Sequence, residues 1–360
     1  MQIDERSPLD SALAAVHPRR VILAALALGG AAAAIAPAAD LAAKKKKKKK
    51  VWTDRAQFGS AGTGDGNLNF PASVTVSANG RTAWVADTEN HRISVWTRPT
   101  STSTEWSHSV NFGSAGTGDA NFNYPWGVTV SVDGRTIWVA DKDNHRISVW
   151  TRTTNTSADW SHSINFGSEG SGNTNFNYPY GVAVSADGRT AWVADTFNNR
   201  ISVWTRTTNT STDWSPSYTF GSQGTGDAYF WEPIGVAVSA DERTVWVADN
   251  RNNRISVWTR PTGSSTTWSH SINFGSVGSE DANLTYPADV AVSANGRSAW
   301  VADSFNNRIS VWTRPTGSST EWSHSINFGS EGSGVAVSAD GRTVWVVASY
   351  PGHISIWTYS

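Results

Sequence analysis

Residues 121–150 read NFNYPWGVTVSVDGRTIWVADKDNHRISVW, and close variants of this stretch recur along most of the chain. Its Val- and Ile-rich runs at 128–131, 136–141 and 146–150 have the length and composition of β-strands. The dipeptide Asp133-Gly134 between the first two runs is typical of a tight hairpin turn. The tripeptide Phe-Gly-Ser returns every 54 residues, beginning at residues 58, 112, 166, 220, 274 and 328. Such a period indicates a repeat architecture, either a solenoid or a propeller.

The strand pattern within one copy distinguishes these two architectures. In the third copy, strands are expected at 182–185, 190–195, 200–204 and 214–220, and nothing in the copy has helical spacing. Four antiparallel strands repeated six times are typical of propeller blades. Residues 52–58 align with the fourth strand of a copy, whereas the chain stops on a third strand at 354–357. We therefore expect an all-β, six-bladed β-propeller over 51–360, whose N-terminal strand (51–58) completes the last blade and closes the ring.

The stretch 121–150 closely resembles the NHL repeat. That repeat has an apolar-Pro-x-Gly-Val-Ala-Val segment, a turn, an apolar-aromatic-Val-Ala-Asp strand and an Asn-x-Arg-Ile hairpin. The resemblance extends to all six copies and implies a propeller fold, although the copies are longer than usual in the outer loop, as at 151–159, and carry Trp where the family often has Tyr. The family includes adhesive and protein-binding domains, RNA-binding domains and a few metal-dependent lyases, so the resemblance alone does not select a function.

The chain contains 20 Trp, an unusually large number, and eighteen of them follow the repeat. They form one series on each of the expected second, third and fourth strands, which predicts a role in blade structure and blade-to-blade packing. Only Trp126 and Trp231 fall outside these series.

The N-terminal region differs from the repeats in composition. Residues 21–39 carry no charge, follow Arg19-Arg20 and end in small residues, the pattern of an export signal cleaved near residues 38–43. We expect 1–43 to be this signal, which resembles the twin-arginine type, and the protein to be secreted or held at the cell surface. The alternative is a membrane anchor formed by 21–39, since about 19 apolar residues can just span a bilayer.

Charge is distributed unevenly along the chain. Lys44 to Lys50 form an uninterrupted basic run, expected to be a disordered arm that either contacts an anionic membrane or cell-wall surface or serves only as a solvated spacer. Residues 51–360 hold 19 Lys and Arg against 26 Asp and Glu, a net charge of −7, which disfavours binding of nucleic acid. The chain has no Cys, which excludes a disulfide scaffold, a zinc–thiolate site and a cysteine nucleophile.

Five copies carry the motif Asp-x-x-Asn-x-Arg across the hairpin between the expected second and third strands. Because Asp ends one strand and Arg begins the next, we expect an ion pair, with Asn in the left-handed position of the turn. This arrangement favours a structural role over a functional site. The five sets are Asp87/Asn90/Arg92, Asp141/Asn144/Arg146, Asp195/Asn198/Arg200, Asp249/Asn252/Arg254 and Asp303/Asn306/Arg308.

Metal sites have little support in the pattern. His91 and His145 occupy the same hairpin loop in consecutive copies, and imidazole is a common metal ligand. The Gly-rich loops that precede the blades contain acids, but these match no dense calcium-ligand spacing. We therefore expect no cofactor, with Ca²⁺ or Zn²⁺ bound at such positions as the alternative. Asp289 is the one carboxylate expected on the innermost strands, and a single acid does not make a general acid–base pair.

Positions that vary between copies are more informative about function than those that repeat. The residue before the first strand and the middle of the hairpin loop lie on the same face of a propeller, and several copies carry aromatic side chains there. Clustered exposed aromatics commonly mark an interface, although they can also simply cover the rim of the fold. The candidate ligand-binding residues are Trp126, Tyr180, Phe197, Trp231, Arg251, Asp289, Phe305 and Tyr350.

The sequence thus predicts an exported, non-catalytic binding or scaffold propeller that recognises a protein or carbohydrate through an aromatic-lined face. The alternative is a metal-dependent lyase or lactonase-like enzyme that uses His91, His145 and Asp289 at the mouth of the central channel.

Overall fold

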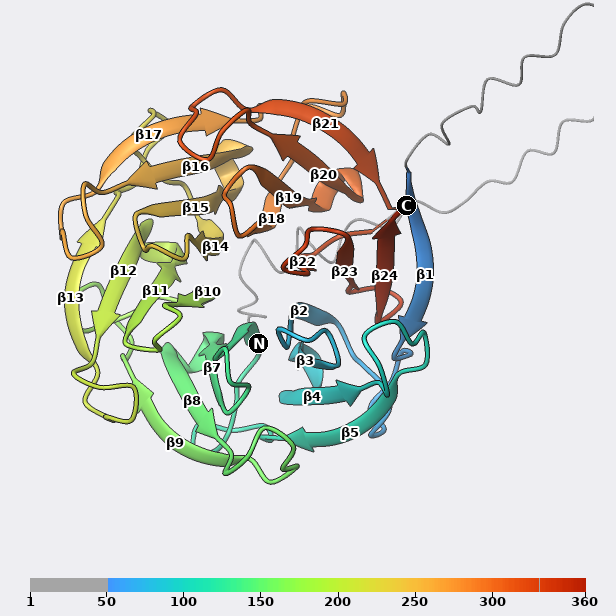
Figure 1. Cartoon of the computed structure of the whole chain (residues 1–360). Coiled ribbons are helices and arrows are strands. Elements are labelled where there is room, and N and C mark those ends of the chain that lie inside the picture. The colour runs from blue at the N-terminus through green and yellow to red at the C-terminus, as the bar shows by residue number, and fades with distance from the viewer. Residues whose placement is uncertain (1–50, 330) are drawn as a thin grey trace, which may run out of the picture. The chain divides into compact units, whose positions relative to one another are not determined.

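Each copy of the repeat folds into a four-stranded antiparallel sheet, and six such sheets surround a central axis as the blades of a propeller (Figure 1). The computed structural model describes residues 51–329 and 331–360, so the expected export signal, its cleavage site and the lysine run (1–50) lie outside the described residues. The all-β, six-bladed architecture expected from the repeat is confirmed. No helix in the described part of the chain is long and apolar enough to cross a bilayer.

The strands follow one another from the inside of each blade to its outer edge. Blades one and two consist of β2 (Pro71–Val76), β3 (Thr82–Asp87), β4 (Arg92–Thr97) and β5 (Ser107–Phe112), then β6 (Pro125–Val130), β7 (Thr136–Asp141), β8 (Arg146–Thr151) and β9 (Ser161–Phe166). Blades three and four consist of β10 (Pro179–Val184), β11 (Thr190–Asp195), β12 (Arg200–Thr205) and β13 (Ser215–Phe220), then β14 (Pro233–Val238), β15 (Thr244–Asp249), β16 (Arg254–Thr259) and β17 (Ser269–Phe274). Blades five and six consist of β18 (Pro287–Val292), β19 (Ser298–Asp303), β20 (Arg308–Thr313) and β21 (Ser323–Phe328), then β22 (Gly334–Val337), β23 (Thr343–Ala348), β24 (His353–Tyr359) and β1 (Trp52–Phe58). Single 3₁₀ turns join the second and third strands of the first five blades: η1 (Thr88–Asn90), η2 (Lys142–Asn144), η3 (Thr196–Asn198), η4 (Asn250–Asn252) and η5 (Ser304–Asn306).

The N-terminal strand closes the ring as expected. β1 pairs antiparallel with β24, from Trp52 opposite Tyr359 to Phe58 opposite Ile354, and forms the outer edge of blade six (Figure 1). Its Trp52 ring stacks on Phe328 of blade five, with ring centroids 4.7 Å apart. Both ends of the described chain therefore contribute to one blade, and no blade is left without its fourth strand.

The hydrophobic cores lie between neighbouring blades, because the second and third strands are covered on both faces. Between blades two and three, buried Trp138, Ile147 and Phe166 pack in one cluster with Val182 and Trp204. The outermost strands instead begin with alternating exposed and partly buried positions and end on a buried residue, as in β13. Packing one blade on the next therefore buries the apolar side chains that the repeat supplies.

Arginine and tryptophan side chains connect the blades at the end of the third strand. In blade three, Trp214 stacks on Phe166 of the preceding blade, with ring centroids 4.8 Å apart. The Arg206 guanidinium lies 4.8 Å from the Trp214 ring and 5.5 Å from the Trp138 ring of blade two. The same contacts recur in the first five blades, and in blade six Tyr359 packs on Trp52, with ring centroids 5.3 Å apart. These contacts confirm a structural role for Trp residues that follow the repeat.

The turn between the first and second strands is longer than a two-residue hairpin. In blade three it spans residues 185–189, is closed by the bond from the Ser185 N–H to the Thr190 carbonyl at 2.9 Å, and places Gly188 at φ +71°. Blade four has Glu242 at this position with φ +57°, a conformation that is unfavourable for a residue with a Cβ. The Glu242 carboxylate pairs there with Arg260 at 3.2 Å.

Candidate functional site

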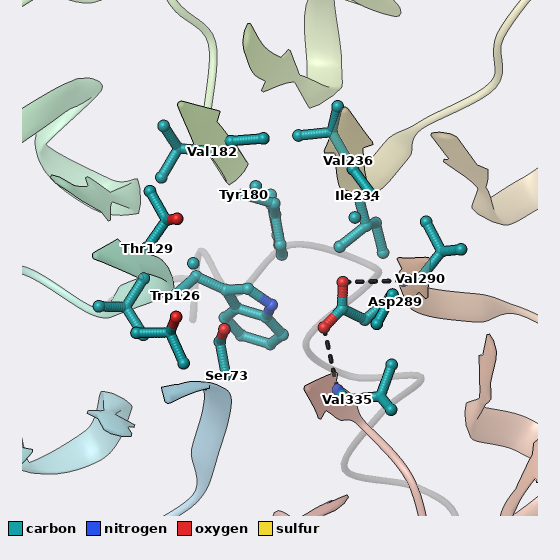
Figure 2. A pocket seen from close by; sticks show the side chains of 18 of the residues that line it. Ser73, Trp126, Thr129, Tyr180, Val182, Ile234, Val236, Asp289, Val290 and Val335 are labelled. Atoms are coloured by element: carbon teal, nitrogen blue, oxygen red, sulfur yellow. Dashed lines mark hydrogen bonds between the residues drawn. The ribbon is translucent and has the colours of Figure 1, made fainter. Parts of the chain in front are cut away.

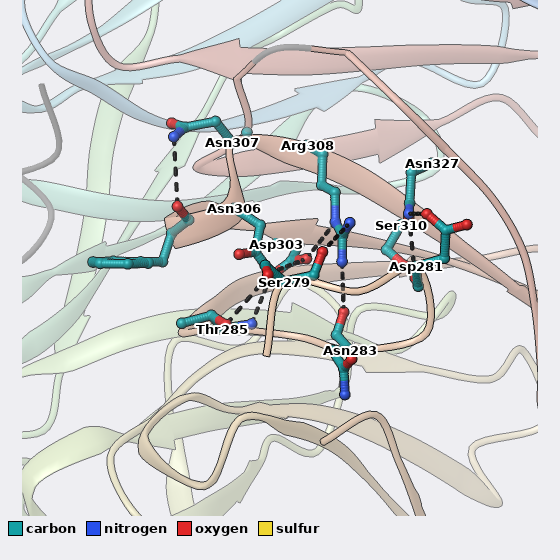
Figure 3. A network of polar contacts seen from close by, with 12 residues as sticks. Ser279, Asp281, Asn283, Thr285, Asp303, Asn306, Asn307, Arg308, Ser310 and Asn327 are labelled. Atoms are coloured by element: carbon teal, nitrogen blue, oxygen red, sulfur yellow. Dashed lines mark hydrogen bonds and ion pairs between the residues drawn. The ribbon is translucent and has the colours of Figure 1, made fainter. Parts of the chain in front are cut away.

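In the first five blades the Asp-x-x-Asn-x-Arg motif fastens the loop before the blade to the hairpin of that blade, as Figure 3 shows for blade five. In blade five the fully buried Asp303 carboxylate accepts the Thr285 N–H at 2.7 Å, the Asn306 amide at 2.8 Å and Arg308 Nε at 2.8 Å. The Arg308 guanidinium also donates to three carbonyl oxygens of the loop before β18, at 2.7–3.1 Å. Burial raises the pKa of Asp303, and its three donors oppose that rise. This Asp–Asn–Arg clasp has the structural role that was expected.

The left-handed residue of the hairpin is not the Asn of the motif, as the sequence suggested, but the residue after it. In blade three, Asn198 ends η3 and donates its amide to the Gly170 carbonyl at 2.9 Å, whereas Asn199 adopts φ +53°. The expectation was wrong because the side chain of Asn198 is needed as a donor that holds the preceding loop.

His91 and His145 occupy this left-handed position in blades one and two, at φ +53° and +52°. Nδ1 of His91 accepts the N–H of Tyr124 in the next blade at 3.2 Å, and Nδ1 of His145 accepts that of Tyr178 at 3.2 Å. Burial lowers the pKa of both imidazoles, which favours the neutral form that can accept at Nδ1. Each ring therefore joins two blades. Within the described residues no group of three or more His, Asp or Glu is arranged to hold a metal ion.

A pocket of about 280 Å³ lies at the centre of the ring, where the first strands of the blades meet (Figure 2). Trp126, Tyr180 and Ile234 form apolar walls, and Asp289 is the only charged side chain among the described residues that line it. Figure 2 shows these side chains converging on the same space. Trp126 is 5% exposed and Tyr180 0%, so the structure places these two aromatics in the pocket wall rather than on an open rim.

The ring is narrow at the level of Asp289. The corresponding positions in other blades include Gly127, Gly181 and Gly235, where a Cβ would come within 2.5, 2.2 and 2.6 Å of atoms of the next blade. The innermost strands thus approach too closely there to admit a side chain. Asp289 lies in β18, and the first strand of the next blade, β22, is shorter than the other first strands. The Asp289 carboxylate projects into the pocket (Figure 2).

Among the described residues, only backbone N–H groups donate to the Asp289 carboxylate. Oδ1 accepts the Val290 N–H at 2.8 Å and Oδ2 accepts the Val335 N–H at 3.0 Å (Figure 2). Burial raises the pKa of Asp289 to about 6, and these two N–H groups limit the rise. The pocket therefore holds a carboxylate whose charge is only partly compensated by the protein.

A buried lysine lies close to the aromatic wall. Lys142 is 1% exposed, and its Nζ lies 5.4–5.7 Å from the ring centroids of Tyr124, Trp126, Tyr178 and Tyr180. The ammonium also pairs with Asp143 at 2.8 Å. The corresponding residues of other blades are small and polar, such as Thr196, whose hydroxyl donates to the Pro233 carbonyl of the next blade at 2.7 Å. Cation–π attraction to four rings holds the walls of the pocket in place.

The other candidate residues lie on the loop face, defined as the face formed by the loops before the first strands and by the second-to-third-strand hairpin loops. Phe197 packs against Tyr178, with ring centroids 5.1 Å apart. Phe305 packs against Tyr286 at 5.7 Å. The Arg251 guanidinium lies 5.5 Å from the centroid of the same Tyr286 ring and forms an ion pair with Glu232 at 2.9 Å.

Three of the candidate side chains on the loop face are open to solvent. Trp231 is 40% exposed, Phe305 49% and Tyr350 65%. The structure thus brings Trp126, Tyr180 and Asp289 together in the central pocket and leaves the other five candidates on the surrounding loops.

Two groups of residues were missed by the sequence analysis. Tyr124, Tyr178 and Tyr286 directly precede a Pro and adopt φ of +50° to +51° just before the first strands, whose residues line the pocket. In blade four this position is Glu232, which pairs with Arg251 of the same blade. The simultaneous change to an acid and a base in one copy could have indicated from the sequence that the two residues are in contact. Lys142 was missed although it is the only Lys in residues 51–360.

Comparison with known proteins agrees with this geometry. Three stretches, residues 68–96, 122–150 and 230–258, match the model of the NHL repeat. No curated protein matches the chain in sequence.

Solved structures share the fold at low sequence identity. A functionally unknown protein from Desulfotomaculum acetoxidans superposes with a TM-score of 0.56 at 12% identity, covering 84% of this chain and 88% of that protein. The Cps50 (Swd1) β-propeller domain of Myceliophteria thermophila gives 0.56 at 12% identity, covering 86% and 100%. A putative 6-phosphogluconolactonase from Bacteroides uniformis gives 0.52 at 16% identity, covering 72% and 71%. At these identities the similarity shows the fold alone. The chain is therefore a six-bladed β-propeller in which three stretches match the NHL repeat.

Proposed function

We propose that the protein is an exported, non-catalytic binding or scaffold propeller that recognises a protein or carbohydrate partner through its loop face. The observation that carries this proposal is the location of the differences between blades. The clasps, cores and arginine–tryptophan contacts are nearly the same in the first five blades, whereas Trp231 has no aromatic counterpart in another blade and the hairpin position of Phe305 and Tyr350 is aromatic in only some blades; all three side chains are exposed on one face. Large apolar side chains left in water at one face are typical of a surface that a partner covers.

The composition of the loop face supports recognition by contact. Aromatic rings supply large contact areas at low entropic cost, and Arg251 beside Glu232 adds polar groups that can orient a partner. These features suit a protein surface or the faces of sugar rings. Binding to peptide and to glycan arrays distinguishes a protein partner from a carbohydrate partner.

Binding accounts for the central pocket better than catalysis does. A metal-dependent lyase or lactonase-like reaction needs a metal site or a pair of acid and base groups. Asp289 is the single carboxyl among the described lining residues, and His91 and His145 use Nδ1 to join blades. We therefore favour recognition over chemistry at this site.

Export is proposed from the N-terminal sequence alone. Residues 1–43 have the pattern of an export signal, and Lys44 to Lys50 would then place seven positive charges near the new N-terminus, suited to an anionic membrane or cell-wall polymer. Fractionation with N-terminal sequencing tests this. A mature chain beginning between residues 39 and 44 outside the cytoplasm is expected, and an intact leader in the membrane fraction would instead support the anchor at 21–39.

Binding of the full chain to peptide and glycan arrays tests the proposed function. We expect signal on one array type, with a loss of at least about tenfold for the double variant Trp231→Ala/Phe305→Ala. Val132→Ala is the matched control, because Val132 is 69% exposed but lies in the turn between β6 and β7, on the opposite face. Equal signal from the wild type and the double variant, with both folded by circular dichroism, would refute the role of the loop face.

A further inference from the structure

We propose that the central pocket binds one primary ammonium group carried on an apolar stem, with Asp289 as its counter-ion and Trp126, Tyr180 and Ile234 around the stem. The group is either the side chain of a lysine presented by a partner or a free alkylamine. This inference deepens the proposed function and rests on it, since it names the chemical group that a partner on the loop face would insert into the channel.

The charge of Asp289 is the first argument. Its two oxygens accept only the N–H groups of Val290 and Val335, at 2.8 and 3.0 Å, and no Lys, Arg or His is among the described residues that line the pocket. Burial without a counter-ion raises the pKa of this carboxyl to about 6. An incoming cation would lower that pKa and stabilise the ionised form.

No neighbouring element supplies the missing counter-ion. β18 packs against β14, β15, β16, β19, β22 and η5, and of these elements β14, β22 and η5 carry no titratable side chain. The titratable groups on the others are already paired: Asp249 with Arg254 at 2.8 Å, and Asp303 with Arg308 at 2.8 Å. Asp289 is thus the one carboxylate here that the described residues leave without a cationic partner.

The size of the pocket is the second argument. Pockets for drug-sized ligands enclose roughly 300–1,000 Å³, so a volume of about 280 Å³ suits a single side chain rather than a folded ligand or an oligosaccharide. The close approach of the strands at Gly127, Gly181 and Gly235 keeps the ring narrow at this level. A slender alkyl stem fits these limits.

The chemistry of the walls selects an organic cation over a metal ion. Ca²⁺ takes six to eight oxygen ligands, whereas the described lining residues offer one carboxylate and a few hydroxyl groups among aliphatic and aromatic side chains. Trp and Tyr rings attract organic cations through their faces. Lys142 shows the same attraction inside this protein, since its ammonium lies within 5.4–5.7 Å of four rings, two of which belong to the pocket wall.

Isothermal titration calorimetry of the full chain with n-butylammonium tests the proposal, with n-butanol as a probe of the same stem without the charge. We expect saturable binding of the amine at pH 7.5 and at least about tenfold weaker binding of the alcohol. Lowering the pH to 5 should weaken amine binding about tenfold, because only about a tenth of a carboxyl with a pKa near 6 is then ionised.

Variants identify the anchoring group. Asp289→Gly introduces the residue found at the corresponding position of four other blades, so it should fold, and Asp289→Asn keeps the size of the side chain. Both should lose amine binding at least about tenfold. Glu89→Gln is the matched control, since it removes an exposed carboxylate from the same loop face and should leave binding unchanged.

A second titration, with Nα-acetyl-lysine methylamide, distinguishes a lysine of a partner chain from a free alkylamine as the source of the ammonium group. Tighter binding of this compound than of n-butylammonium supports a lysine of a partner chain, and the reverse supports a free amine. Equal affinity for the amine and the alcohol, no binding of either amine, or unchanged binding by Asp289→Gly would overturn the inference. Array binding that depends on Trp231 and Phe305 would still stand in that case, so the proposed function fails or survives on its own experiment.

Discussion

Removing one Asp–Asn–Arg clasp should destabilise the propeller strongly. In Asp303→Ala, the buried N–H of Thr285, the Asn306 amide and Arg308 Nε lose acceptors now at 2.7–2.8 Å. Breaking a buried ion pair by deleting one partner costs about 3–5 kcal/mol. The three carbonyl oxygens that still accept from Arg308 keep the loss within this range rather than above it.

Urea and thermal unfolding of the full chain measure this loss. The free energy of unfolding should fall by about 3–5 kcal/mol and the melting midpoint by roughly 6–15 °C. Asp213→Ala, which removes an exposed aspartate from the loop before β13, should change stability by less than about 0.5 kcal/mol. The double variant Asp303→Ala/Arg308→Ala should lose less than the sum of the two single variants, because the orphaned charge is removed as well. If Asp303→Ala behaved like Asp213→Ala, the stabilising role of the clasp would be refuted.

Four further changes have defined outcomes. Burial raises the pKa of Asp289 from 3.8 to about 6, so its contribution to stability is fully present below about pH 4 and is lost as the pH rises through 6. Between pH 5 and 7.5 the free energy of unfolding of the wild type, measured with urea, should therefore fall by roughly 1–2 kcal/mol relative to that of Asp289→Gly. Parallel dependences of the two unfolding free energies on pH would contradict this. Glu242→Gly should raise the melting midpoint, since relief of the φ +57° conformation, worth about 1–2 kcal/mol, exceeds the loss of the pair with Arg260, whose guanidinium keeps its bonds to the Tyr218 hydroxyl and the Ser265 carbonyl; a lower midpoint would show that the pair dominates. Lys142→Thr should cost roughly 2–3 kcal/mol through a cavity beneath four rings and alter the near-UV circular dichroism, and an unchanged spectrum would count against the wall-holding role. Trp52→Ala should speed amide exchange in β24 but not in β12, because the stack with Phe328 joins blade six to blade five and does not involve blade three; uniform exchange rates would oppose local opening.

The parts of the fold that could be predicted are those that repeat. Phe58 and its counterparts every 54 residues end fourth strands because each blade is one copy of the same hydrogen-bonded unit. Asp87 and Arg92 could be paired from sequence because they bracket a hairpin of fixed length, and the structure places them directly opposite each other. The closing role of 52–58 followed from the missing fourth strand after residue 357.

The parts that could not be predicted depend on backbone angles at single residues. Tyr124 and Tyr178 have left-handed φ, which places Trp126 and Tyr180 in the pocket wall rather than on an open rim. No local sequence signal marks a tyrosine for that conformation, because it is held by the Nδ1 of His91 or His145 from another blade. The sequence also could not show that Asn199 rather than Asn198 is the left-handed residue of the hairpin, because both are Asn and Asn tolerates that conformation at either position.

The closing strand also has a consequence for the order of folding. Arg55 Nε donates to Thr358 Oγ1 at 3.0 Å across 303 residues of sequence, while the five other blades each form from a contiguous stretch of chain. Contacts between distant residues are slow to form because a long loop must first be closed. β1 is therefore the first strand to be synthesised but must wait for β24, and until then blade six presents the open edge of β24 and the Phe328 ring of blade five lacks its cover. We expect the time to reach the native state to be set by this single meeting of the two ends, however quickly the five local blades assemble.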